Sequence, residues 1–220
     1  AWYTSTVRLH TFQAVLLDMD GTLVDSETLW RVAEREFATR HQIPLTPDLQ
    51  QTFVGKAVPA VMAFLMSEFG LTGTVQERVE ELESIVKQLL PNVKENVGTS
   101  ELIALLNEHK MPRAIASNSS REIIVATLTN QPWATDIPKK FSIDDVVRGK
   151  PEPDIYLLAA SSLNVSPQKC LVIEDSLTGT EAAIRAGMTC CLLTHGHDVQ
   201  TNLTPLIFRD LTEVLEWLRE

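Results

Sequence analysis

Cysteines, long apolar runs and metal-binding residue pairs are scarce in this sequence, and each shortage excludes a class of protein. Cysteine occurs three times, at Cys170, Cys190 and Cys191, in or beside apolar runs. This usage indicates reduced core thiols in a cytoplasmic protein, not a disulfide framework. No second Cys or His pair has the spacing of a zinc site. No apolar run approaches the roughly 18 residues that a membrane-spanning helix needs, so we expect no membrane segment.

Positive charge is also in short supply. The chain has 19 Lys and Arg residues against 29 Asp and Glu residues, which gives a net charge of -10. Nucleic acids and anionic membranes need a basic surface, so the charge argues against both as partners. A small phosphorylated substrate stays possible, because a local positive site can lie in a negative protein. The opening "AWYTSTVRLH" lacks the pattern of a signal peptide, and we expect residues 1–11 to be a processed or added end.

The 220 residues contain four short apolar runs, at residues 14–17, 114–116, 171–173 and 190–193. Each is too short for a helix and lacks alternation, which is typical of strands buried on both faces. Helical spacings of apolar residues lie between these runs. Alternation of strands and helices predicts an α/β fold with a doubly wound parallel sheet of the Rossmann-like kind.

One region breaks this alternation. Residues 26–90 show three helical stripes of apolar residues and no convincing strand, with Pro and Gly residues between the stripes. We therefore predict a core of residues 12–25 and 91–220, with an all-helical insert of residues 26–90 after the first strand.

Polar side chains follow the predicted strands, where an open parallel sheet binds its ligands. Asp18 and Asp20 follow the first run, Ser117 and Asn118 follow the second, and Glu174 and Asp175 follow the third. The segment "GKPEPD", which contains Lys150, precedes the third run. We expect these groups to converge on one site.

This set of groups suits Mg²⁺ and phosphoryl transfer. Mg²⁺ prefers oxygen ligands and often shares a phosphate, while Ser117, Asn118 and Lys150 can bind phosphoryl oxygens. One Asp can attack phosphorus and form an aspartyl-phosphate. The second Asp can protonate the leaving oxygen and then deprotonate the attacking water.

The segments "DMDGTLVD", "SNSS", "GKPEPD" and "EDSLTG" resemble, in order, the four motifs of the haloacid dehalogenase superfamily. The resemblance implies a Mg²⁺-dependent hydrolase in which the helical insert is a mobile cap. It implies that Asp18 is the nucleophile and a metal ligand, and that Asp20 is the general acid/base with its carbonyl on the metal. Ser117 and Lys150 would bind phosphate, while Asp175, with Glu174, would complete the metal site.

Within this resemblance the sequence favours a phosphatase of small phosphorylated metabolites, such as sugar or polyol phosphates. Asp20 argues against the metal-free dehalogenases, which lack an Asp there. The alternative is a β-phosphoglucomutase, although this chain has Val24 and Trp30 where the mutase has Thr and His. A non-enzymatic receiver that carries a phosphorylated Asp is a further alternative, but the long insert is against it because a receiver encloses no substrate.

The leaving group of the substrate would be recognised by the insert. Glu27, Trp30 and Lys56 are the candidate contacts there, although Glu27 can equally cap a helix and Trp30 can equally serve packing. We expect a monomer or weak dimer with no nucleic-acid or membrane partner. Residues 128–144 depart from the usual pattern of the family, and the sequence offers no account of this departure.

Overall fold

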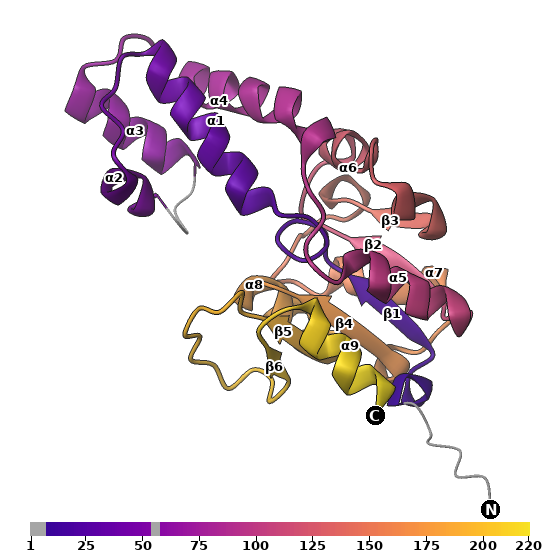
Figure 1. The fold of residues 1–220 in the computed structure, drawn as a ribbon. Helices are drawn as coiled ribbons and strands as arrows, with labels where there is room; N and C mark the ends of the chain where they lie inside the picture. Colours follow the sequence, from indigo (N-terminus) through magenta and orange to yellow (C-terminus); the bar gives the residue numbers. More distant parts are fainter. Residues whose placement is uncertain (1–7, 54–57) are drawn as a thin grey trace, which may run out of the picture. The chain divides into compact units, whose positions relative to one another are not determined.

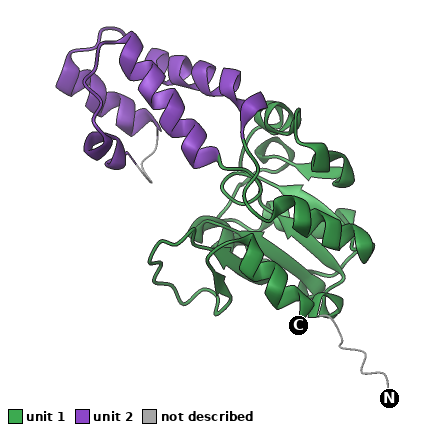
Figure 2. Ribbon diagram, viewed as in Figure 1, with its two compact units in different colours: residues 1–25, 94–220 green, residues 26–93 purple. Residues whose placement is uncertain are grey.

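Figure 1 shows a computed structural model of the chain, which describes residues 8–53 and 58–220. The chain divides into two units, drawn in different colours in Figure 2. Ala1–Asp25 and Lys94–Glu220 form the first, here called the sheet unit, and Ser26–Val93 form the second, here called the helical unit.

The sheet unit is built on a parallel sheet whose strand order is β3-β2-β1-β4-β5-β6. Its strands are β1 (Ala14–Leu17), β2 (Arg113–Ala116), β3 (Lys139–Phe141), β4 (Cys170–Glu174), β5 (Thr189–Leu193) and β6 (Ile207–Phe208). The first strand therefore lies inside the sheet, between β2 and β4. This topology confirms the predicted α/β, Rossmann-like fold.

Helices cover both faces of the sheet (Figure 1). The helices α7 (Asp154–Ser162) and α8 (Leu177–Arg185) pack on one face, where they bury Leu16 and Val172. The helices α5 (Thr99–Glu108) and α9 (Leu211–Arg219) lie on the opposite side, and α6 (Arg121–Leu128) follows β2. All four residues of β1 are fully buried, as expected for a strand covered on both faces.

The edge strands β3 and β6 were not foreseen from the sequence. β3 reads "KKF", and both lysines turn their ammonium groups back onto backbone carbonyls, Lys139 onto that of Ser162 and Lys140 onto those of Ala134 and Ile137. Lysines on an edge strand discourage pairing with another chain. The segment of residues 128–144 that the sequence left unexplained thus supplies this edge, with the short helices η3 (Pro132–Asp136) and η4 (Ile143–Asp145) on either side.

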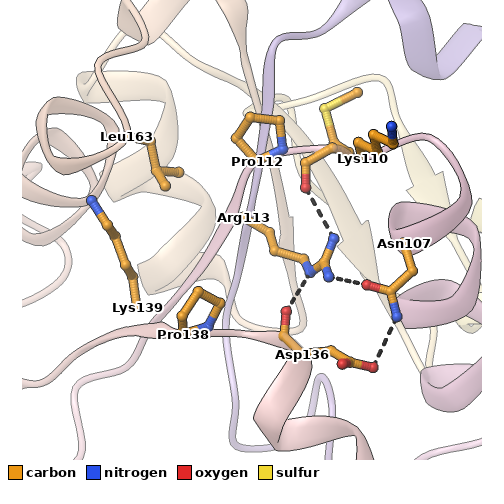
Figure 3. Close-up of a pocket in the computed structure, with 9 residues that line it drawn as sticks. Asn107, Lys110, Pro112, Arg113, Asp136, Pro138, Lys139 and Leu163 are labelled. Atoms are coloured by element: carbon orange, nitrogen blue, oxygen red, sulfur yellow. Dashed lines mark hydrogen bonds between the residues drawn. The ribbon is translucent and has the colours of Figure 1, made fainter.

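Arg113 is the first residue of β2 and lines a pocket of about 420 Å³ (Figure 3). Its Nε donates to the Asp136 carbonyl at 2.8 Å and its Nη1 to the Met111 carbonyl at 3.0 Å. Its Nη2 donates to Asn107, whose amide in turn donates to the Asp136 carboxylate. The guanidinium therefore joins the end of α5, the start of β2 and η3.

The helical unit has its own core. The described residues form α1 (Ser26–Arg40), α2 (Pro47–Gln51), α3 (Val58–Phe69), α4 (Val75–Leu89) and the short helix η2 (Leu90–Asn92). Helix α4 begins at a capping box in which Thr74 and Glu77 satisfy each other's backbone donors. The buried apolar side chains follow helical spacing, including Leu29, Ala33, Phe37, Met62, Leu65, Val79, Leu82, Ile85 and Val86.

Candidate active site

The carboxyl ends of β1, β2 and β4 bring the polar groups predicted from the sequence into contact. Asp18 directly follows β1, Ser117 directly follows β2, and Glu174 is the last residue of β4. Because these three strands are parallel neighbours, their ends meet at one edge of the sheet. The site lies wholly within the sheet unit.

Lys150 is the cation of this site. Its Nζ donates to Asp18 Oδ1 at 2.5 Å and to Glu174 Oε1 at 2.7 Å. The three side chains are almost completely buried, with exposed fractions of 3%, 9% and 0%. Charge-assisted bonds of this kind are stronger than neutral ones, and burial shields them from water. Lys150 is therefore held between two carboxylates and is not a free surface lysine.

Both carboxylate oxygens of Glu174 accept hydrogen bonds. Its Oε1 accepts from Lys150 and, at 2.8 Å, from the Tyr156 hydroxyl. Its Oε2 accepts from the Ser176 hydroxyl at 2.9 Å and from the backbone nitrogens of Asp175 and Ser176 at 3.1 Å each. A β-carbon on Gly179 would lie 1.6 Å from Oε1, so glycine is required there. These donors suit Glu174 to orienting Lys150.

Asp20 points at the second motif. Its Oδ2 accepts from the Ser119 hydroxyl at 2.7 Å and from the Ser117 hydroxyl at 3.3 Å. Asp18 and Asp20 therefore have different partners, since Asp18 is bonded to Lys150. Ser119 belongs to the segment "SNSS" but was not predicted as a site residue, although its two-residue spacing from Ser117 places both side chains on one side of an extended turn.

Asn118, a predicted phosphate binder, lies on the backbone of Lys150. Its Oδ1 accepts from the Lys150 backbone nitrogen at 2.9 Å, and its Nδ2 donates to the Lys150 carbonyl at 3.2 Å. This two-point contact ties the turn after β2 to residues 149–153, here called the lysine loop. In the structure the Asn118 side chain thus positions Lys150.

Negative charge exceeds positive charge at this site. Burial, followed by the charge of Glu174, raises the pKa of Asp18 to about 7. Burial, followed by the charges of Asp18 and Glu174, raises the pKa of Asp175 to about 9. Burial acts in the same direction on Glu174, but the charge and hydrogen bond of Lys150, together with hydrogen bonds from Ser176 and Tyr156, lower the pKa of that carboxyl below its usual range. Asp18 and Asp175 are thus carboxyls that lack sufficient compensating charge.

A divalent cation fits this arrangement. Among the described residues, Asp18, Glu174 and Asp175 place carboxylate oxygens within 4.8 Å of one another. Hard oxygen donors of this kind suit Mg²⁺. Gly21, with φ of +81°, also makes room, because a β-carbon there would lie 1.9 Å from an Asp175 oxygen. A cation would offset the burial and the repulsion between carboxylates that raise the pKa of Asp18 and Asp175.

The two described candidate substrate contacts, Glu27 and Trp30, lie in the helical unit. Glu27 and Trp30 belong to α1, where Glu27 is exposed and pairs with Arg31 at 2.9 Å, while Trp30 is half-buried. Lys56 lies outside the described residues.

The helices of the described chain include none long and apolar enough to cross a membrane.

Comparison with known proteins places these groups in context. The family model of haloacid dehalogenase-like hydrolases matches residues 15–193. A validoxylamine A 7'-phosphate phosphatase of Streptomyces hygroscopicus subsp. limoneus is 32% identical over 92% of this chain and 96% of its own length. A phosphorylated carbohydrates phosphatase of Thermotoga maritima is 34% identical over 80% of this chain and 82% of its own length.

Solved structures show the same fold. A Thermotoga maritima protein described as a "putative beta-phosphoglucomutase" superposes with a TM-score of 0.85. It is 27% identical in sequence, and the match covers 94% of this chain and 98% of that one. The match therefore includes almost all of both the sheet unit and the helical unit.

Proposed function

The chain belongs to the haloacid dehalogenase-like hydrolases as a phosphoric monoester hydrolase, and we propose that it acts on small sugar or polyol phosphates through Asp18. One observation carries the proposed role of Asp18. Its carboxylate lies buried beside Lys150 at the carboxyl end of the central strands, with Asp20 two residues on. A nucleophile, a cation and a separately held proton donor are the parts that phosphoryl transfer through an aspartyl-phosphate uses.

The proposed reaction has two steps. Asp18 attacks phosphorus, the bond from phosphorus to the leaving oxygen breaks, and Asp20 gives that oxygen a proton. Water then attacks the aspartyl-phosphate, gives its proton to Asp20, and frees inorganic phosphate and Asp18. The Ser117 hydroxyl and the Lys150 ammonium would hold the phosphoryl oxygens through both steps.

Asp18, Asp175 and the backbone carbonyl of Asp20 would hold Mg²⁺, with Glu174 beside them. The ion, when bound, supplies positive charge that offsets repulsion between the carboxylates and the phosphoryl group. Because both Glu174 oxygens already accept hydrogen bonds, we assign Glu174 chiefly to holding Lys150.

The helical unit would serve as the cap, and residues 26–90 would recognise the leaving group through Glu27, Trp30 and Lys56. Caps of this kind control water around a reactive intermediate.

All three cysteines are free and buried in the structure, which agrees with a reducing compartment. We propose a cytoplasmic location on this ground, and a monomer or weak dimer without nucleic-acid or membrane partners as expected from the sequence.

A phosphate-release screen over sugar, polyol and nucleotide monophosphates tests this function. With Mg²⁺ we expect multiple turnovers on sugar or polyol phosphates, and with EDTA we expect activity to fall to background. A preference for nucleotides would overturn the substrate class. Equal turnover with EDTA would overturn the metal dependence.

A mutase stays the second candidate, because the Thermotoga maritima structure with a TM-score of 0.85 carries that description. Val24 stands where the mutase motif has Thr. It is fully buried, and its backbone forms isolated β-bridges with Asp20 and with Glu95. Incubation with β-glucose 1-phosphate separates the two functions. A phosphatase releases inorganic phosphate, whereas a mutase accumulates the 6-phosphate.

A further inference from the structure

Asp20, the proposed general acid/base, is held by the turn that follows β2. The Ser119 hydroxyl donates to Asp20 Oδ2 at 2.7 Å, while the Ser117 hydroxyl donates to the same oxygen at 3.3 Å. The shorter contact is the optimal length for a hydrogen bond from a hydroxyl, and the longer one is weak. Ser119 is thus the stronger of the two partners.

The backbone around Ser119 is fixed at both ends. Its N–H donates to Ser117 Oγ at 3.0 Å, and its carbonyl accepts from the Ile143 backbone nitrogen at 3.2 Å. Side chains alternate along this turn, since Ser117 and Ser119 face Asp20 while Asn118 faces the backbone of Lys150. Because the backbone of Ser119 is held in place, its hydroxyl starts from a fixed position from which it donates to Asp20.

Ser117 cannot hold Asp20 throughout the proposed reaction. It already accepts from the Ser119 N–H, and its own proton is the donor that a bound phosphoryl group would need. When that proton turns to phosphate, its bond to Asp20 is lost. The Ser119 hydroxyl is then the contact of this turn that keeps the Asp20 carboxyl in place.

We propose that Ser119 is a positioning residue for Asp20, which aims this carboxyl at the leaving oxygen. The proposal rests on the proposed phosphatase function. It makes a specific demand on kinetics, because a misplaced general acid slows the departure of a poor leaving group more than that of a good one. An alkoxide needs the proton, whereas p-nitrophenolate leaves readily without it.

The experiment measures kcat/KM for glycerol phosphate and for p-nitrophenyl phosphate, because this constant reports the steps up to departure of the leaving group. We expect Ser119→Ala to lower the value for glycerol phosphate about tenfold and that for p-nitrophenyl phosphate less than about threefold. Ser119→Thr keeps the hydroxyl and should restore the ratio of the two values toward that of the wild type.

Ser162→Ala is the matched control, since it removes a 2.7 Å hydroxyl bond to the Ala159 carbonyl, far along the chain in α7. It should leave the ratio unchanged. Inhibition by inorganic phosphate checks the other role that Ser119 can have. A positioning role predicts an unchanged inhibition constant for Ser119→Ala, whereas a rise matching the loss of kcat/KM would assign Ser119 to phosphate binding and overturn the proposal.

Equal losses on both substrates would also overturn it, because a merely structural role slows both alike. If the wild-type protein hydrolysed neither substrate, the proposed function would be contradicted. The wild-type measurement alone shows this, so a failure of the function is distinguished from a failure of the role proposed for Ser119. Thermal unfolding of each variant verifies that the proteins compared are folded.

Discussion

The ammonium of Lys150 faces more negative charge than it can balance. Four carboxyl groups, those of Asp18, Asp20, Glu174 and Asp175, lie at the site of this one buried cation. Asp18 and Glu174 take its two shortest contacts, so Asp175 receives less of its charge and has a pKa raised to about 9, mainly through burial. The site thus combines one satisfied carboxylate with acids that would be stabilised by a further cation.

Removing the Lys150 charge should destabilise the protein. Lys150→Met leaves Asp18 and Glu174 buried beside each other without their cation, and breaking a buried pair in this way typically costs about 3–5 kcal/mol. Urea unfolding in EDTA measures the loss.

The double variant Lys150→Met/Glu174→Gln is the matched comparison, since it also removes one of the two carboxylate charges that the single variant leaves without a cation. It should recover part of the stability lost by the single variant. A single variant as stable as the wild type would show that the Lys150 contacts contribute nothing to folding.

Asp18, Ser117 and Glu174 lie at the strand ends where the sequence predicts them, because short apolar runs followed by polar residues are recognisable from the sequence. It did not reveal Ser119 or Tyr156. The Tyr156 hydroxyl reaches Glu174 because α7 packs across the sheet, and that packing cannot be read from residue order. Likewise, the partners of Asn118 depend on how the lysine loop folds back.

Among the elements, the turn from β4 into α8 shapes the site most directly. Glu174 ends β4, and Ser176 caps α8 by accepting from the Gly179 backbone nitrogen at 3.0 Å. The Ser176 hydroxyl donates to Glu174 in the same turn. One capping residue therefore begins the helix and fixes the carboxylate that orients Lys150.

Gly179→Ala tests this turn, because its expected effect on stability is opposite to the usual effect of replacing glycine by alanine in a helix. Alanine in a helix is normally favoured over glycine by about 1 kcal/mol. Here the new β-carbon would lie 1.6 Å from Glu174 Oε1, so we expect destabilisation of about 1–3 kcal/mol and a loss of activity. Chemical unfolding and phosphate release measure the two effects.

Thr178→Ala, at an exposed position in the same turn of α8, is the control and should be nearly neutral. Stabilisation by Gly179→Ala would mean that the turn relaxes freely around the new methyl group, contrary to the close packing of Gly179 against Glu174.

Elements were predictable where burial dominates their sequence. β1, β2, β4 and β5 are short apolar runs and were recognised as strands. β3 was missed because two of its three residues are lysines, and β6 because it has two residues. Both lie at the sheet edges, where pairing with a neighbour, and not a hydrophobic pattern, makes the strand.

At the scale of the whole molecule, the charge of the site couples stability to pH. Burial raises the pKa of Asp18 to about 7 and of Asp175 to about 9, so the folded protein binds protons that the unfolded chain, with ordinary carboxyls, has released. Stability from these groups is fully present below about pH 4 and is lost as pH rises through the folded values. Their contribution therefore decreases between about pH 4 and pH 9.

Thermal unfolding in EDTA across this range measures the effect. The decline should be shallower in Asp175→Asn, because the variant lacks one titrating group and relieves Asp18 of a neighbouring charge. Asp198→Asn, in an exposed loop, should follow the wild type. A slope in Asp175→Asn equal to that of the wild type would contradict the assignment.

The proposed mechanism depends on attack of Asp18 on phosphorus, and phosphate release by Asp18→Asn in the presence of Mg²⁺ tests this step. Asparagine keeps the size of the side chain and its contact with Lys150 but removes the nucleophilic carboxylate. With p-nitrophenyl phosphate, we predict multiple turnovers by the wild type and a loss of at least about a thousandfold in the folded variant. Turnover by folded Asp18→Asn at a rate near that of the wild type would show that Asp18 is not the nucleophile.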